Sequence, residues 1–213
     1  MKKFDIITEA DARVLDIGAT VELAAGGLVT PLARDTLAAR RVTVMAAGAS
    51  DPALAADLVP PAEIRRIAIG SDHSGVKLKQ DLVSHLRGRG FAVSDLGTAG
   101  SDPVDYPDTA AAVAKAVARN EAEAGIVIDG AGLGSAIAAN KVRGIRAAMC
   151  NDETLARYSR EHNGANVIAL GATLIDADAA RRIVDVWLAT PMREARYIRR
   201  LVKIRRLEDF SSH

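Results

Sequence analysis

An acidic residue meets a glycine-rich loop in IVIDGAGLGSAIAANK, residues 126–141, where an apolar run ends at Asp129. The residues that follow leave the backbone almost bare: Gly130, Gly132, Gly134 and Ser135. Backbone amides at the start of a helix bind anions, and a carboxylate beside them can exchange protons with a ligand. The loop therefore predicts a small anionic ligand in contact with Asp129. A turn that only packs a helix against a strand would carry the same glycines, so the loop alone favours neither interpretation.

Nucleotide-binding motifs do not fit this loop. A dinucleotide-binding fingerprint would have Gly at position 135 and would follow the first strand of its unit, whereas Ser135 stands here after a third apolar run. No lysine of the P-loop type follows the glycines either. A nucleotide-binding module is therefore disfavoured.

Two other stretches place ionisable side chains at the ends of predicted elements. Asp72 and His73 follow an apolar run, and a histidine beside an acid at such a position favours a functional role. His162 and Asn163, in SREHNGAN, end a predicted helix. They can form its C-terminal cap and also serve a ligand.

Basic residues share one face of the last predicted helix, REARYIRRLVKIRRL. Arg196 and Arg200 lie one turn apart, a spacing that suits a bidentate contact with a phosphate, although a solvated basic face would show the same pattern. Tyr106, in VDYPD, is predicted to line a ligand site or to hold its own loop. Cys150 lies in an apolar run and is predicted to be an unreactive core residue.

The elements that must position these residues alternate along the chain. Strands are predicted at residues 66–70, 91–97, 124–130, 145–151 and 167–172, and helices at 74–90, 107–119, 134–141, 152–162, 176–188 and 192–207. This alternation predicts an α/β fold with a doubly wound, five-stranded parallel sheet in a Rossmann-like three-layer sandwich. Ligands of such sheets bind outside the carboxyl ends of the strands, where Asp72 and Asp129 are expected.

The chain is predicted to have three parts. Residues 1–47 are expected to form a small α-rich extension, with one helix capped by Thr8, a second that starts at Thr30-Pro31, and a strand in VTVMA. Residues 48–64 are rich in Ala, Pro and Asp and are predicted to be a linker. Residues 65–213 are predicted to be the main domain.

Composition argues against several classes of protein. The chain has 28 Lys and Arg against 27 Asp and Glu, a net charge of +1, so we expect no nucleic-acid partner and no membrane-surface partner. No apolar run reaches the ~18–20 residues of a membrane span, and acidic residues interrupt the start of the chain where a signal peptide would be apolar. A single cysteine suits a reducing cytoplasm.

Six motifs in this order resemble the family of type B ribose-5-phosphate isomerases and galactose-6-phosphate isomerase subunits. They are GSDHSGVKLK, VDYPD, GAGLGSAIAANK, GIRAAMC, SREHNGAN and the closing pair Arg196 and Arg200, and together they cover residues 65–208. The resemblance implies a doubly wound α/β fold and a homodimer or higher homo-oligomer whose sites use both subunits. It also implies interconversion of aldose and ketose phosphates through an enediolate, without a metal or cofactor.

The resemblance implies a role for each candidate residue. Asp72 would contact sugar hydroxyls, and Tyr106 would line the site. His73, Arg196 and Arg200 would hold the phosphate. His162, with Asn163 beside it, would assist ring opening. Amides around Gly130–Ser135 would stabilise the enediolate oxygen.

The chain departs from the family pattern at the catalytic base. Many members carry a cysteine base where Asp129 stands and a threonine where Ala131 stands, and others carry a glutamate where Ser135 stands. Asp129 is therefore the candidate base, because a well-placed carboxylate can move a proton between adjacent carbons. The alternative is a protein that binds sugar phosphates, or assists assembly, without catalysis. The natural substrate, with four, five or six carbons, is left open.

The extension has a resemblance of its own. GGLVTPLARDTLAARRVTV is similar to short segments attached to enzymes of bacterial microcompartments. This resemblance implies a protein-shell partner for residues 1–47 and a location inside such a compartment in the cytoplasm. A segment this short cannot bury a large core, so we expect it to bind a partner or support an oligomer rather than catalyse.

Overall fold

The computed structural model describes residues 2–46, 58–61, 63–192 and 195–208. The chain forms two compact units, Met1–Ala56 and Asp57–His213, so the division falls inside the segment predicted as a linker. None of the helices in the described residues is long and apolar enough to cross a membrane.

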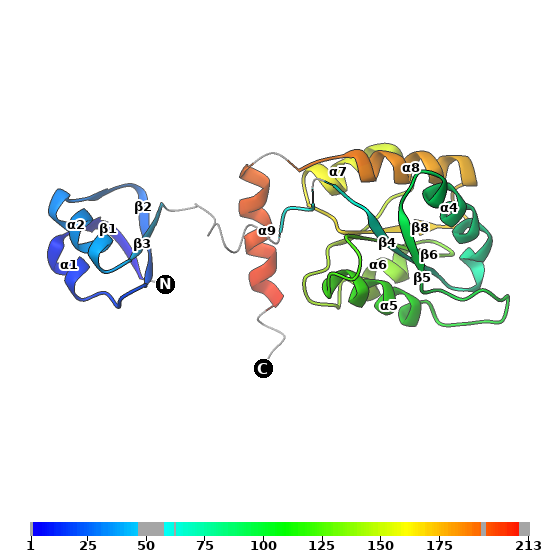
Figure 1. Ribbon diagram of the computed structural model, residues 1–213, viewed down its shortest axis with the longest axis horizontal. Coiled ribbons are helices and arrows are strands. Elements are labelled where there is room, and N and C mark those ends of the chain that lie inside the picture. Colours follow the sequence, from blue (N-terminus) through cyan, green and yellow to red (C-terminus); the bar gives the residue numbers. More distant parts are fainter. Residues whose placement is uncertain (1, 47–57, 62, 193–194, 209–213) are drawn as a thin grey trace. The chain divides into compact units, whose positions relative to one another are not determined.

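The first unit is a three-stranded parallel sheet with two helices (Figure 1). Its elements are β1 (Lys3–Ile7), α1 (Glu9–Arg13), β2 (Thr20–Val29), α2 (Pro31–Ala39) and β3 (Thr43–Ala46). The strands lie in the order β1-β2-β3. Both helices pack against the sheet through a small core that includes Ile7, Ala12, Val21 and Leu37.

The two predicted helix starts and the predicted strand are present in this unit. Thr8 forms a capping box with Asp11, and Pro31 is the first residue of α2. The description of the unit as α-rich was wrong, because β1 and β2 were not predicted. The middle of β2 is Ala-Ala-Gly-Gly, which has weak strand propensity and lies at a bulge: Phe4 of β1 pairs with Leu23 and Ile6 pairs with Leu28, so the strand is recognisable only from its paired ends.

The second unit has the predicted five-stranded parallel sheet, in the order β5-β4-β6-β8-β7. Its strands are β4 (Arg66–Ser71), β5 (Ala92–Asp95), β6 (Ala124–Asp129), β7 (Ala147–Met149) and β8 (Val167–Gly171). Its helices are the short η1 (His73–Gly75), α4 (Val76–Gly88), α5 (Tyr106–Ala118), α6 (Leu133–Ala139), α7 (Glu153–Glu161), α8 (Ala177–Ala189) and α9 (Ala195–Leu207).

The sheet separates two cores, which confirms the three-layer architecture. Alternate residues of a strand point to opposite faces. Ile67 and Ile126 pack with the apolar sides of α4, α7 and α8, whereas Ala68 and Val127 pack with α5 and α6. Figure 1 shows these helices on either side of the central strands.

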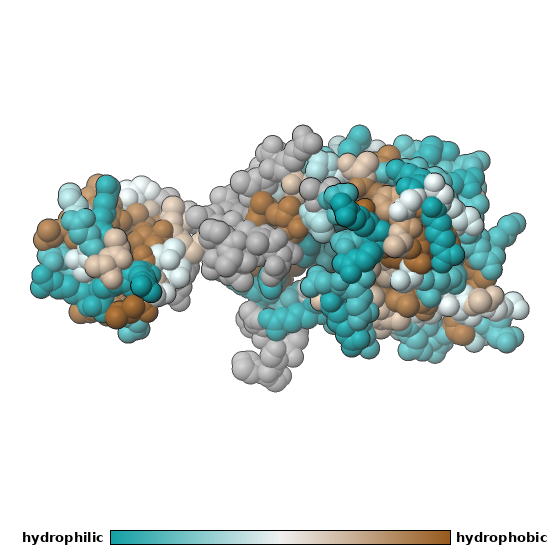
Figure 2. Space-filling view, viewed as in Figure 1, coloured by the Kyte–Doolittle hydropathy of each residue, from teal (hydrophilic) through white to brown (hydrophobic). Residues whose placement is uncertain are grey.

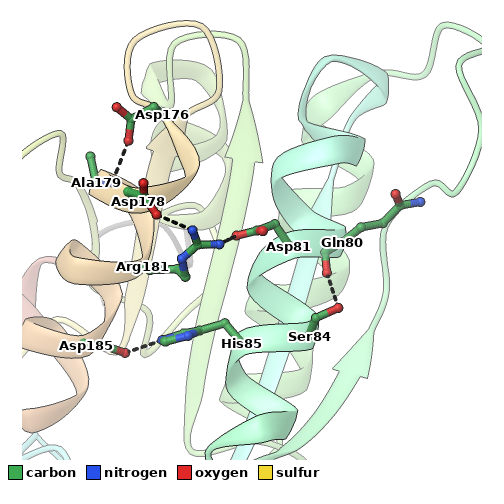
Figure 3. Close-up of polar contacts among 9 residues, drawn as sticks. All are labelled: Gln80, Asp81, Ser84, His85, Asp176, Asp178, Ala179, Arg181 and Asp185. Atoms are coloured by element: carbon green, nitrogen blue, oxygen red, sulfur yellow. Dashed lines mark hydrogen bonds and ion pairs between the residues drawn. The ribbon is translucent and has the colours of Figure 1, made fainter.

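Polar contacts join α4 and α8 along their outer sides (Figure 3). Arg181 on α8 pairs with Asp81 on α4 and with Asp178 on its own helix. One turn further on, Nε2 of His85 lies 2.8 Å from Oδ1 of Asp185. These contacts fix α4, whose first residue directly follows η1 at the end of β4.

The last helix, α9, packs against the beginning of the second unit. Leu58, Met192, Leu201 and Val202 form a small separate core. A Cβ added to Gly164 would lie 2.9 Å from Leu201 and 3.0 Å from the carbonyl of Leu58, so the chain approaches α9 closely at this glycine.

Candidate functional site

The loops after β4 and β6 run to opposite faces of the sheet. The chain leaves β4 into α4 on one face, and it leaves β6 into α6 on the other. In open α/β sheets, such a reversal between neighbouring strands leaves a crevice outside their carboxyl ends, which is the usual ligand site. Asp72 and His73 follow β4, and Asp129 ends β6, so the structure brings these predicted residues to one crevice.

Asp72 is buried and shapes the turn after β4. Its Oδ1 accepts hydrogen bonds from the amide of Ser74 at 2.9 Å, from the Ser74 hydroxyl at 2.6 Å and from the amide of Gly75 at 3.3 Å. Its own amide donates to the carbonyl of Ile128 on β6 at 3.2 Å. The turn is therefore tied to the neighbouring strand.

His73 is exposed and is oriented by the loop after β5. The amide of Val104 donates to Nδ1 of His73 at 3.3 Å. A ring nitrogen that accepts a hydrogen bond carries no hydrogen, so the neutral imidazole carries its hydrogen on Nε2. Nε2 can then donate to an anionic ligand.

Asp129 binds the backbone of its own loop. Its Oδ1 accepts from the amides of Ala131, at 2.9 Å, and Gly132, and its Oδ2 accepts from the amide of Ser135 at 2.8 Å. Three amides of the stretch predicted to stabilise an enediolate therefore hold this carboxylate instead. The reason is local, since an aspartate side chain reaches the amides two and three residues ahead of it.

Two glycines of this loop are needed for close packing. Gly132 has a φ of +77°, and a Cβ there would lie 2.9 Å from the carbonyl carbon of Leu170. A Cβ on Gly134 would lie 2.5 Å from the ring of Tyr106. Tyr106, the first residue of α5, thus rests on the start of α6 beside the Asp129 loop, and its contact with a ligand stays a prediction.

Two further residues lie at this crevice and were not predicted from the sequence. The hydroxyl of Thr173 donates to the carbonyl of Gly130 at 2.6 Å, and its amide donates to the same carbonyl at 3.0 Å. Ser74 Oγ lies 3.8 Å from the position of a Cβ built on Gly130. Both residues lie shortly beyond the end of a strand, Thr173 two positions after β8 and Ser74 three positions after β4, in an Asp-x-Ser turn, and that signal could have identified them.

His162 and Asn163 lie in a second group, away from this crevice. His162 is the C-cap of α7, and its ring stacks on Tyr158 and Tyr197 with centroid distances of 4.7 and 4.5 Å. The amide side chain of Asn163 donates to the carbonyl of Tyr158. The left-handed residue of the predicted cap is Gly164, with a φ of +54°.

Two arginines, the buried Arg160 and the half-buried Arg146, hold the segment that follows His162. Arg160 donates to the carbonyl of Ala165 at 2.8 Å, and Arg146 donates to the carbonyl of Gly164 at 2.9 Å. Burial lowers the pKa of each guanidinium to about 10, so both remain charged at neutral pH. They neutralise the carbonyl-rich end of α7.

Of the two arginines predicted to hold the phosphate, the structure describes the side chain of one, Arg200. Arg200 is exposed on α9, with its guanidinium 5.7 Å from the ring centre of Tyr197. Arg196 lies on the same helix, but its side chain is outside the described residues. Arg200 therefore belongs to the group around His162.

The two groups lie at opposite ends of the strands, one towards the amino ends and the other at the carboxyl ends. Helix α7 starts after the carboxyl end of β7 and returns the chain to the amino end of β8. Asn166, just before β8, accepts from the amide of Arg146, just before β7, at 2.8 Å. His162 and Arg200 therefore lie towards the amino ends of the strands, whereas Asp72 and Asp129 lie at the carboxyl ends.

Cys150 is buried, and its thiol is unreactive. Burial raises the pKa of its thiol to about 11, so it is protonated at neutral pH. Within the described residues, no group of three or more His, Cys, Asp and Glu side chains is arranged to hold a metal ion.

The fold and the crevice define a doubly wound α/β protein whose ligand site lies at a topological switch point. Residues 67–204 match the Ribose/Galactose Isomerase family. The chain belongs to this family.

Named relatives and solved structures agree with this assignment. Ribose-5-phosphate isomerase B of Escherichia coli (strain K12) is 43% identical over 145 residues, which are 68% of this chain and 97% of that protein. D-erythrulose-4-phosphate isomerase of Pectobacterium atrosepticum is 41% identical over 124 residues, 57% of this chain and 81% of that protein. The structure of ribose-5-phosphate isomerase B from Clostridium thermocellum has a TM-score of 0.68 at 49% identity, covering 69% of this chain and 99% of that chain.

Proposed function

We propose that this protein is an aldose–ketose isomerase that acts on a sugar phosphate. The observation that carries the proposal is the meeting of Asp72, His73 and the Asp129 loop at the switch point, within a chain of the Ribose/Galactose Isomerase family. Asp72 is assigned to sugar hydroxyls and His73 to the phosphate. Relatives that act on ribose 5-phosphate and on erythrulose 4-phosphate are both similar to this chain, so five- and four-carbon sugar phosphates are the first substrates to test.

Asp129 is assigned as the base through its Oδ2. Oδ1 accepts two amide hydrogens, whereas Oδ2 accepts one, from Ser135, and keeps a lone pair for a substrate proton. Removal of the proton from C2 of an aldose leaves an enediolate; return of that proton to C1, with transfer of the O2 hydroxyl proton to O1, gives the ketose. Oδ2 carries the proton between the two carbons.

The developing negative charge on the substrate oxygen needs donors that Asp129 does not use. Leu133 and Gly134 lie in the first turn of α6, where an amide has no partner inside its own helix. We assign these two amides to the enediolate oxygen.

The complete site is assigned to a homodimer. One chain holds its two groups at opposite ends of the strands, and a sugar phosphate must contact both. His162 and Arg200, and Arg196 by family resemblance, would then come from the second protomer, with His162 assisting ring opening. Exposed large hydrophobic side chains lie near both groups, Leu133 and Ile137 on α6 and Tyr158, against the His162 ring, on α7, as expected of an interface.

Hydrogen exchange tests the chemistry directly. We expect deuterium to enter C2 or C1 when the protein is incubated in D₂O with ribose 5-phosphate, then with tetrose and hexose phosphates. The sugar with the highest kcat/KM identifies the chain length. Binding of every one of these sugars without exchange would instead establish a non-catalytic sugar-phosphate-binding protein.

The base assignment has its own test. Asp129→Asn keeps an oxygen for the amides of Ala131 and Gly132 but replaces Oδ2 by an NH2 group, which is not basic and cannot accept from the amide of Ser135. We therefore expect turnover to fall ~10²–10⁴-fold and the free energy of unfolding to fall by ~1–3 kcal/mol. Wild-type turnover in a correctly folded Asp129→Asn protein would exclude Asp129 as the base.

The first unit is assigned to partner binding, with a protein shell of a bacterial microcompartment in the cytoplasm as the proposed partner. None of the candidate site residues lies in residues 1–47. Several of its apolar side chains are exposed, among them Val14 at 75% and Ile17 at 74%. Apolar patches among polar residues are visible on this unit in Figure 2.

A further inference from the structure

A buried lysine lies under the loop that orients His73. Lys79 is on the buried stripe of α4 with Leu82, Val83 and Leu86, and it is 1% exposed. Its Nζ donates to Oδ1 and Oδ2 of Asp95 and to the carbonyl of Thr98, each at 2.7 Å. An ammonium group has three hydrogens, and these contacts give each of them an acceptor at the end of β5.

The acceptors of Lys79 fix the beginning of the loop formed by residues 96–105. Asp95 Oδ1 also accepts from the amide of Gly97 at 3.1 Å. The amide of Thr98 donates to the carbonyl of Ser71, the last residue of β4, at 3.2 Å. The start of the loop is therefore attached both to α4 and to the strand that delivers Asp72.

The end of the same loop touches two residues of the crevice. Val104 donates to Nδ1 of His73, and Tyr106 packs on Gly134. A displacement of the loop would remove the donor that keeps the hydrogen of His73 on Nε2. It would also move Tyr106 away from the Asp129 loop.

Stability alone does not account for a charge at this position. Replacing a buried ion pair by apolar residues is often neutral or stabilising, because the desolvation cost offsets the attraction. An apolar side chain cannot, however, hold the carbonyl of Thr98. The contact that an apolar replacement would lose is therefore the one that fixes the loop.

We propose that Lys79 is a positioning residue: through Asp95 and Thr98 it holds the loop of residues 96–105 so that Val104 sets the tautomer of His73. The inference rests on the proposed function only for the contact between His73 and the phosphate. The tautomer itself is a property of the free protein.

The experiment compares Lys79→Met with Lys79→Arg and with Lys77→Met, a matched control on an exposed neighbouring lysine. Ring ¹⁵N chemical shifts of His73, assigned with His73→Gln, report the tautomer in the absence of any sugar. We expect hydrogen on Nε2 in the wild type and in Lys77→Met, a mixture of tautomers in Lys79→Met, and recovery in Lys79→Arg. With an active substrate, KM should rise about tenfold in Lys79→Met while kcat changes less, because a charge-assisted contact with the phosphate is weakened.

An unchanged His73 spectrum in folded Lys79→Met would overturn the proposal. If Lys79→Met does not fold, Asp95→Asn, at a partly exposed position, replaces it, and an unchanged spectrum there has the same meaning. Failure of the proposed isomerase activity is distinguishable, because it would leave the tautomer of His73 and its dependence on Lys79 intact.

Discussion

Aspartates at the starts of loops and helices accept hydrogen bonds from the backbone amides that follow them. Asp72 and Asp129 accept hydrogen bonds from amides of the turns that they begin, and Asp152 and Asp176 cap α7 and α8. The positions of Asp72 and Asp129 were predicted, because both follow apolar runs. Their hydrogen bonds were not predicted, because these depend on side-chain rotamers that sequence spacing does not specify. Their roles towards a substrate stay predictions.

Gly134 gives a prediction at the residue scale. A Cβ at this position would lie 2.5 Å from the Tyr106 ring, so Gly134→Ala should push the ring away from the site. We expect kcat/KM to fall by about tenfold to 10²-fold, because small displacements of positioning groups are costly in catalysis. Stability should change by less than ~1 kcal/mol, since Ala is the better helix former.

Steady-state kinetics and urea unfolding check this expectation. Gly88→Ala is the matched control, because Gly88 ends α4 and a Cβ there would meet no atom within 4 Å. Unchanged kinetics in Gly134→Ala would show that Tyr106 has no part in substrate binding.

The elements of the second unit were predictable because their hydrophobic periods are clear. Short continuous apolar runs define β4, β6 and β8, which are buried on both faces of the sheet, and apolar residues every three or four positions define α4 and α8. The separation of His162 and Arg200 from Asp129 was not predictable from such patterns. It depends on the order of strands in the sheet, which a list of elements leaves open. Lys79 had a local signal, a lone charge in the apolar stripe of α4.

Helix α8 gives a prediction at the element scale. Asp176 accepts from the amide of Ala179 at 2.7 Å and caps this helix (Figure 3). Asp176→Ala should lower the free energy of unfolding of the second unit by ~1 kcal/mol, because the cap bond is lost. Urea unfolding followed by fluorescence of Trp187, the single tryptophan, measures it.

Asp178→Ala is the control for the cap. Asp178 lies in the same first turn and pairs with Arg181, but its side chain is 75% exposed. An exposed ion pair contributes only ~0–1 kcal/mol, so this variant should lose less stability than Asp176→Ala. Equal losses would contradict the capping argument.

The whole molecule separates into a unit that carries every candidate site residue and a unit that carries none. Within the second unit, which carries the site residues, the two halves of the proposed site lie apart. Both facts make predictions about assembly rather than about single contacts.

Mixed protomers test the shared site. Asp129→Asn and Arg200→Ala should each be nearly inactive alone. Unfolding and refolding an equimolar mixture should restore about one quarter of wild-type turnover, because one of the two sites of a mixed dimer then carries neither substitution. No recovery in mixtures that contain mixed dimers would place both residues in a site formed by one chain.

Deletion of residues 1–56 tests the role of the first unit. The second unit has its own core, so the shortened chain should keep wild-type kcat and KM. It should no longer co-purify with shells. If the shortened chain still co-purified with shells, the assignment of shell contact to the first unit would be wrong.

The carboxylate of Asp129 also has a consequence for inhibition. Free oxyanions such as sulfate compete for loops whose amides are vacant, but here a tethered anion already occupies three of them. Tethering gives it a local concentration that a dissolved competitor cannot match. Sulfate acting at this loop should therefore change the turnover of this protein little.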